Sequence, residues 1–351
     1  MRDAAPARPD PRPGPSSPER PAAIACRGLW KVYGPKAEKV AREGVDAPGH
    51  VTAVRNVSLS VARGEMLVVM GLSGSGKSTL LRCLARLVEP TAGDLRIDGV
   101  DIRALDERGL VRLRREKMGM VFQSFALLPN RTVLDNVAFP LEMRGAPAAA
   151  RYARAREMVR LVGLAGREDH YPRELSGGQQ QRVGIARSLA IEPDIWFLDE
   201  PFSALDPLIR REMQDEFLKL KGMLHKTIVF VTHDFDEALR LADRIAVMHD
   251  GRVEQADTPD RVLLAPATDY VASFTRDVPK ARVVRAATLA EAAPPTPDAP
   301  AAAASATIAG IARMLVETTA ERLPVIDEAG RVLGSLSRAR ALDLLFEDDR
   351  R

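Results

Sequence analysis

The chain is poor in cysteine, which argues against a metal site built from cysteines and against a secreted protein held together by disulfides. Its 351 residues include two cysteines, Cys26 and Cys83, which lie in different segments and do not have the spacing of a metal site. Secreted scaffolds held together by disulfides need several cysteines, so a protein of the reducing cytoplasm is the simplest reading. We expect Cys83 to be an ordinary core residue.

Long hydrophobic runs are also missing. A membrane-spanning helix needs ~20 apolar residues, and the best run here, Met66 to Leu72, has the length of a strand. The first residues are rich in Pro, Arg and Asp and lack the apolar core of a secretory signal. We expect a disordered tail over residues 1–23. If the protein serves a membrane process, we expect it to be peripheral, on the cytoplasmic face.

Neither sign of charge dominates, and aromatic residues are few. The net charge is +3, and Phe, Trp and Tyr make up 5% of the chain. A basic segment does contain Arg103, Arg108, Arg112, Arg114 and Arg115. No aromatic residues are interleaved with these arginines for stacking on bases, so the segment indicates a solvated helix face rather than a nucleic-acid surface.

A glycine-rich loop lies between an apolar run and a helical pattern. It is a complete G-x-x-x-x-G-K-S that follows the strand-like residues 65–70. Its N–H groups can converge on phosphate oxygens, Lys77 can reach the β- and γ-phosphates, and the Ser78 hydroxyl can bind Mg²⁺. The alternative, a plain glycine turn, would require neither the lysine nor the serine. The residues expected to contact the nucleotide are Gly71, Ser73, Gly74, Ser75, Gly76, Lys77, Ser78 and Thr79.

Two carboxylates follow a second apolar strand, residues 194–198. Ligands of open α/β sheets bind at the carboxyl ends of the strands, where Asp199 and Glu200 would lie. We expect Asp199 to hold Mg²⁺ and Glu200 to polarise the attacking water as general base. Taken alone, the pair also fits a solvated strand end before the turn at Pro201.

Gln123 ends a further buried strand, residues 118–122. Its side chain can coordinate Mg²⁺ and orient water, so we expect it to act in both ways. The following residues, 124–129, are unusually apolar for a loop. They predict either a protein contact surface or a buried connection.

His233, Asp206 and Tyr33 complete the candidate residues within one copy of the chain. His233 follows the strand 227–232, which we expect beside the strand of Asp199, within reach of a γ-phosphate; a satisfied histidine at a strand end is the alternative. Asp206 is placed for an intersubunit contact. Tyr33 either stacks on adenine or packs at the end of a strand.

The run Leu175-Ser176-Gly177-Gly178-Gln179 opens a helix. A glycine turn that caps a helix would explain it if the chain had no phosphate loop. Together with that loop, the run suggests an ATPase that closes each nucleotide between two subunits. Ser176, Gly177 and Gly178 would lie at the N-terminus of this helix, a position that favours anions.

Residues 24–280 resemble the ATP-binding subunit of an ABC transporter. The family's motifs occur in family order, as Walker A (71–78), the Q-loop glutamine (Gln123), the signature (175–179), Walker B (195–199, then Glu200), the D-loop (203–206) and the switch histidine (His233). The resemblance implies an α/β P-loop ATPase with a mixed-sheet core and a helical subdomain at about 124–190. It also implies ATP and Mg²⁺ as cofactors and a head-to-tail homodimer, in which Ser176, Gly177, Gly178 and Gln179 of one copy would hold the γ-phosphate of the nucleotide bound by the other. A transmembrane permease and, indirectly, a solute-binding protein are the expected partners.

Several runs, such as Val121 to Leu127 and Phe202 to Arg210, resemble the importers of quaternary amines. The predicted solute is therefore choline or glycine betaine, with an amino acid or a polyamine as alternative. A soluble ABC protein acting on nucleic acid usually carries two such domains or a long coiled coil, which this chain lacks. The insertion at 34–50 carries no pattern that assigns it a role. We expect an Ala/Pro-rich linker at 281–305 and a single α+β CBS-like unit at 306–351.

Overall fold

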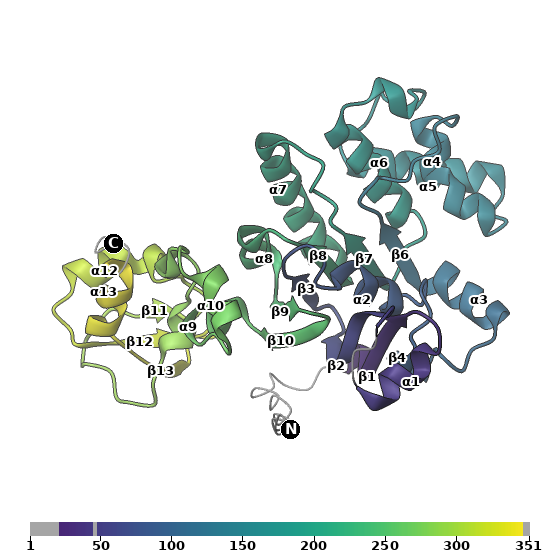
Figure 1. Ribbon diagram of the computed structural model, residues 1–351. Coiled ribbons are helices and arrows are strands. Elements are labelled where there is room, and N and C mark those ends of the chain that lie inside the picture. Colours follow the sequence, from purple (N-terminus) through teal and green to yellow (C-terminus); the bar gives the residue numbers. More distant parts are fainter. Residues whose placement is uncertain (1–20, 45–47, 347–351) are drawn as a thin grey trace. The chain divides into compact units, whose positions relative to one another are not determined.

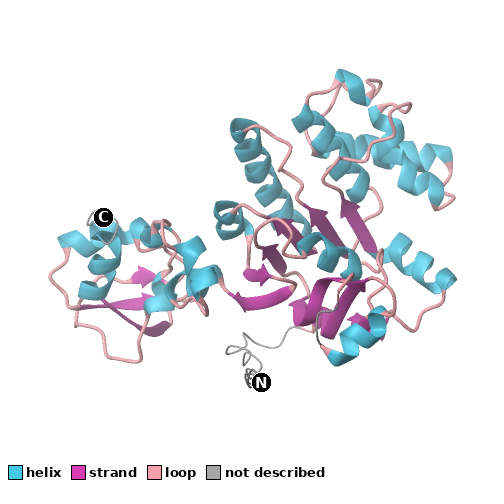
Figure 2. Ribbon diagram, viewed as in Figure 1, coloured by secondary structure: helices cyan, strands magenta, loops and turns pink. Residues whose placement is uncertain are grey.

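The computed structural model describes residues 21–44 and 48–346, which divide into two compact units. The first unit comprises the described residues up to 237 together with 246–255, and the second comprises 238–245 and 256–346. Figures 1 and 2 show their helices and strands. The tail predicted at 1–23 lies outside the described residues except for its last three. Of these, Ala22 and Ala23 begin the first strand.

An antiparallel sheet opens the first unit, with strands in the order β2-β1-β4-β5. Its strands are β1 (Ala22–Tyr33), β2 (Val51–Ala62), β4 (Ala92–Ile97) and β5 (Val100–Asp101). The unassigned insertion between β1 and β2 forms the short helix α1 (Ala37–Glu43), apart from residues 45–47, which lie outside the described chain. Its Val40 and Ala41 pack with Val32, so the insertion covers the end of β1.

The second sheet carries the phosphate loop. Its order is β10-β9-β3-β8-β7-β6, and the pairs β3–β8, β7–β8 and β6–β7 are parallel. The strands are β3 (Met66–Met70), β6 (Met118–Val121), β7 (Ile195–Asp199), β8 (Thr227–Thr232), β9 (Arg244–His249) and β10 (Arg252–Asp257). Every residue of β3, β7 and β8 is buried, as continuous apolar runs predict for strands covered on both faces. The parallel strands therefore end at one common edge.

β9 and β10 are neighbours in this sheet and are joined by a turn at Asp250-Gly251. Both residues have positive φ, 45° and 77°, as a two-residue turn of type I′ requires.

Figure 1 shows the helices of this part of the chain. They are α2 (Lys77–Leu84), α3 (Glu107–Lys117), α4 (Val133–Met143), α5 (Ala148–Leu161), α6 (Gly177–Leu189), α7 (Pro207–Leu224) and α8 (Phe235–Leu241). Helices α4, α5 and α6 pack against one another and form the helical group expected between the Q-loop and Walker B. Phe217 of α7 stacks against Trp196, Phe202 and Phe230 at centroid distances of 5.5–6.0 Å, which anchors α7 on the sheet.

The second unit has its own three-stranded sheet, ordered β11-β12-β13. Its elements include α9 (Pro259–Leu264), α10 (Asp269–Thr275), α11 (Ala286–Leu289), β11 (Ala302–Ala303), α12 (Ala312–Glu317), β12 (Arg322–Ile326), β13 (Val332–Ser337) and α13 (Arg338–Phe346). β12 and β13 pair in antiparallel fashion, and β11 pairs with β12 in parallel. None of the described helices combines the length and the apolar character needed to cross a membrane.

The structure differs from the predicted linker at 281–305. Val284, Ala286, Leu289 and Ala302 are buried in one hydrophobic core with Leu323. Alanine is small enough to pack between closely spaced elements, so a composition typical of a linker here supplies part of a core. Residues 256–280, which we expected to end the ATPase domain, also belong to the second unit.

Candidate active site

The phosphate loop connects β3 to α2. At two of its positions, nearby backbone atoms leave room for glycine only. Gly71 and Gly76 have φ of 151° and 97°. A Cβ atom on Gly71 would lie 2.2 Å from the carbonyl oxygen of Met248, and one on Gly76 would lie 2.0 Å from that of Ala53. Only glycine fits both positions. The loop therefore leads into the N-terminus of α2 along a path that a side chain would block, and a helix N-terminus favours anions.

Lys77 and Ser75 are the buried polar residues of this loop. The Lys77 Nζ atom donates hydrogen bonds to the carbonyl oxygens of Gly71 and Leu72, at 2.8 and 2.9 Å. Burial lowers the pKa of Lys77, while the nearby carboxylates of Glu200 and Asp199 act in the opposite direction. The Ser75 Oγ atom is buried without a hydrogen-bond partner. A buried ammonium bonded to neutral carbonyls and an unpaired hydroxyl both fit a phosphate group.

Ser78 and Asp199 meet, although they are far apart in sequence. The Ser78 hydroxyl donates to Asp199 Oδ1 at 2.6 Å. Arg82 lies one turn further along α2 and pairs with Asp199 Oδ2 at 3.1 Å. Sequence reasoning missed Arg82, although its spacing of four residues from Ser78 places both on one face of the helix.

The three predicted catalytic residues form one cluster. Glu200 Oε2 lies 3.3 Å from Gln123 Nε2 and 3.2 Å from His233 Nδ1. Because the carboxylate accepts, the bond to His233 requires a proton on Nδ1. Glu200 has φ of 45°, and its N–H donates to the carbonyl oxygen of Val231 at 3.0 Å. The strand pairing of β7 and β8 thus turns the carboxylate toward the histidine.

Signature and D-loop residues act as helix caps within the chain. Ser176 Oγ accepts from the N–H of Gln179 at 3.3 Å, and Gln179 Oε1 accepts from the N–H of Ser176 at 3.0 Å. Asp206 Oδ1 accepts from the N–H groups of Leu208 and Ile209. These bonds remain inside α6 and α7. The capping explanation is therefore correct for the signature, and Asp206 caps α7 as well, a role that was not predicted. Any nucleotide or intersubunit role is additional to these caps.

The remaining predicted residues have separate surroundings. Tyr33 is 44% exposed at the end of β1, and Lys31 Nζ lies 4.8 Å from its ring centroid. Ser73 is exposed, and Gly74 has open space around the position of a Cβ. Their roles, and that of Thr79, stay predictions.

The apolar loop after Gln123 is not a buried connection, since none of residues 124–129 is buried. The guanidinium of Arg187 on α6 donates to the carbonyl oxygens of Phe125 and Ala126, at 2.8 and 2.6 Å. Burial lowers the pKa of Arg187. The loop is thus tied to the helical group through its backbone, and its side chains are left partly accessible.

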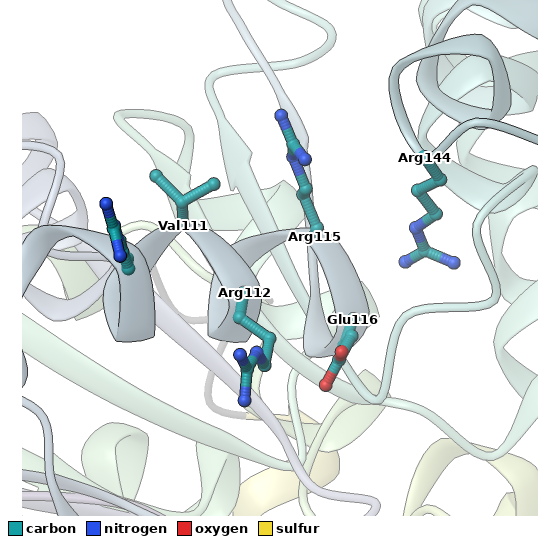
Figure 3. Close-up of a pocket in the computed structure, with 6 residues that line it drawn as sticks. Val111, Arg112, Arg115, Glu116 and Arg144 are labelled. Carbon is teal, nitrogen blue, oxygen red and sulfur yellow. The ribbon is translucent and has the colours of Figure 1, made fainter.

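The arginine-rich segment is only partly the solvated helix face that was predicted, since Arg114 is half-buried and donates to the carbonyl oxygen of Arg86, and Arg103 precedes α3. Arg108, Arg112 and Arg115 are exposed and line a hollow of about 440 Å³, together with Glu116 and, from the end of α4, Arg144 (Figure 3). Arg144 also donates to the carbonyl oxygen of Ile191. These side chains lie on the surface and add no group to the cluster around Glu200.

Comparisons with known proteins agree with this geometry. Residues 54–203 match the model of the ABC transporter family. The chain is 62% identical over 332 residues to the trimethylamine N-oxide transport system ATP-binding protein TmoW of Ruegeria pomeroyi, covering 92% of this chain and 97% of that protein. It is 50% identical over 280 residues to the glycine betaine/proline betaine transport system ATP-binding protein ProV of Escherichia coli, covering 77% and 70%.

A solved dimeric ATP-binding cassette bound to ADP and Pi is 38% identical, with a TM-score of 0.59 over 67% of this chain and 98% of that one. The chain therefore belongs to the ABC transporter family of ATP-binding subunits. It is a nucleotide-binding ATPase that works as part of a transport system.

Proposed function

We propose that the chain powers the import of a small methylated amine, and that trimethylamine N-oxide is the first solute to test. The alignments with two trimethylamine N-oxide system proteins cover 92% and 93% of this chain, whereas the betaine system protein aligns with 77%. The solute proposal therefore rests on one observation: the alignments with the trimethylamine N-oxide system proteins extend into the second unit. Choline and glycine betaine, the solutes predicted from the sequence, are methylated amines as well.

The site supports ATP hydrolysis with Glu200 as general base. Its carboxylate is held by two side chains, and a base must be oriented toward the water that it activates. His233 fixes the carboxylate, and Gln123 would orient the water. Mg²⁺, which would be held by Ser78 and Asp199 with Gln123, would neutralise charge on the phosphates when bound with ATP.

A homodimer would complete the site. Ser176, Gly177, Gly178 and Gln179 lie at the N-terminus of α6, where they would bind the γ-phosphate of a nucleotide held by the other copy. Asp206 would contact the partner, and Tyr33 would stack on adenine. In a head-to-tail dimer with C₂ symmetry, the phosphate loop of each copy would face the signature of the other copy, so that two equivalent sites form. The solved cassette that is dimeric and bound to ADP and Pi supports a dimer of such subunits.

The subunit would bind a transmembrane permease at the cytoplasmic face of the membrane, and a solute-binding protein would deliver the amine. The second unit would regulate transport through its CBS-like part, residues 306–346 of the described chain. Residues 281–305 share a hydrophobic core with residues 306–346, which supports a single accessory unit that includes both segments.

Replacing the proposed base tests the enzymatic part. Glu200→Gln should keep ATP binding, lower kcat at least a hundred-fold and trap a dimer, because the amide cannot accept the proton from water. ATPase assays and size-exclusion chromatography with ATP measure both effects. Turnover near the wild-type rate would exclude Glu200 as the base.

Uptake assays test the solute. The chain, reconstituted in liposomes with its permease and solute-binding protein, should drive ATP-dependent uptake of radiolabelled trimethylamine N-oxide. Choline and glycine betaine serve as competitors, and the Glu200→Gln variant is the matched control. If none of the three amines is transported, the solute class is wrong, whereas the ATPase assignment is tested separately by the variant.

A further inference from the structure

The first two turns of α7 contact the signature helix. A Cβ atom on Gly178 would lie 2.7 Å from Ile209 Cγ2, and one on Gly177 would lie 3.6 Å from Leu205 Cδ2. The N-terminus of α6 therefore rests directly on Ile209 and on the D-loop residue before Asp206. Any shift of α6 has to displace these side chains, because packed interiors leave little free space.

The same turns of α7 also bind the segment that follows the switch histidine. Arg210 NH1 lies 3.5 Å from Asp234 Oδ2, and Gln214 Nε2 donates to Glu237 Oε1 at 2.9 Å. Arg210 and Gln214 are four residues apart and therefore share one face of α7. Asp234 directly follows His233, so its ion pair acts on the backbone next to the catalytic cluster.

Local hydrogen bonds hold the backbone of this segment. The N–H of Glu237 donates to Asp234 Oδ1 at 3.1 Å, and the N–H of Asp234 donates to Thr232 Oγ1 at 3.0 Å. At the other end, the Arg210 guanidinium donates to the carbonyl oxygen of Leu205 at 3.1 Å. One guanidinium thus joins the D-loop to the residue after His233.

We propose that Arg210 and Gln214 are positioning residues, which hold His233 against Glu200 and make its position depend on α7. The proposal rests on the function proposed above, in which Glu200 is the base. Ile209 contacts the signature helix, and its neighbour Arg210 pairs with Asp234, the residue after His233. The helix α7 therefore links the signature to the switch histidine. Movement of the signature helix on nucleotide engagement would then reach His233 through α7.

Arg210→Gln tests this link, with Arg211→Gln as matched control because Arg211 is the next residue and is exposed. Arg210→Gln should lower kcat about ten-fold and leave the KM for ATP within about two-fold, since the nucleotide-binding groups are untouched. The exchange Arg210→Asp with Asp234→Arg restores opposite charges and should recover most of the loss. Arg211→Gln should behave as wild type.

NMR resonances of the histidine rings report on the surroundings of His233 independently of ATPase activity. The chain has five histidines, so His233 can be assigned with a His233→Ala variant. Its ring resonances should shift in Arg210→Gln and Gln214→Leu but not in Arg211→Gln. Unchanged resonances, or a kcat that falls equally in the control, would overturn the proposal. An active Glu200→Gln would instead count against the proposed function, so the two failures can be told apart.

Discussion

Glu237 is a buried carboxyl group whose surroundings favour its protonated form. Burial raises its pKa, against the opposing hydrogen bonds from Thr232 and Gln214 and the charge of Arg210; the neighbouring Asp234 charge adds to the rise. The unfolded chain loses this proton more readily than the folded protein. The stabilising contribution of Glu237 is therefore complete below the ordinary glutamate pKa, and it is lost as the pH rises through the higher folded pKa.

Glu237→Gln should remove this pH dependence. The glutamine keeps an oxygen that accepts from Gln214, but it cannot ionise. We expect a Tm about 2–4 °C above wild type at pH 8 and no gain at pH 4.5, measured by thermal unfolding at both pH values. Glu212→Gln, which changes an exposed carboxyl on α7, is the control. A gain of equal size at both pH values would contradict the assignment to Glu237.

At the scale of elements, the contact between α6 and α7 leaves no room for a side chain at Gly178. Gly178→Ala should push α6 away from Ile209 and lower ATPase activity at least ten-fold, because a Cβ at 2.7 Å forces one element to move. Ile209→Ala in the same chain removes the clashing Cγ2 and should recover part of the activity. Steady-state ATPase assays of the single and double variants measure this.

The control for that prediction is Gly184→Ala on the same helix. A Cβ at Gly184 would have its nearest contact at 3.7 Å, an ordinary van der Waals distance. We expect this variant to keep wild-type activity. If the double variant is no better than Gly178→Ala alone, the clash with Ile209 is not the cause of the loss.

Elements with strong local signals could be predicted from the sequence, and others could not. The buried strands before the phosphate loop and Glu200 were predictable because continuous apolar runs bounded by glycine or acids have few other interpretations. Helix α1 was not, since its N-cap, Lys36, makes no side-chain capping bond and has a left-handed conformation. The approach of His233 to Glu200 was expected because their strands were expected to be neighbours. The hydrogen bonds and ion pair from α7 depend on tertiary packing that local sequence patterns do not encode.

At the scale of the whole molecule, the core of the second unit combines segments that composition assigned to different regions. Val284, Ala286 and Leu289 come from the expected linker, and Leu323 and Val325 come from the expected CBS-like unit. All five are at most 3% exposed. Burying a valine or leucine side chain contributes about 1.5–3 kcal/mol. A boundary at residue 305 would therefore divide one hydrophobic core.

Two truncations distinguish this arrangement from a linker followed by a separate unit. A chain ending at residue 305 should aggregate or lose its cooperative unfolding, because Val284 and Leu289 lose the strands that cover them. A chain ending at residue 257, the end of β10, removes that core together with the helices α9 and α10 of the same unit, so it should be soluble and keep the ATPase activity of the first unit. Soluble expression, size-exclusion chromatography and ATPase assays, with the full chain as reference, measure these outcomes. Equal solubility of both truncations would show that residues 281–305 do not depend on the strands that follow, and that the boundary predicted from composition was correct.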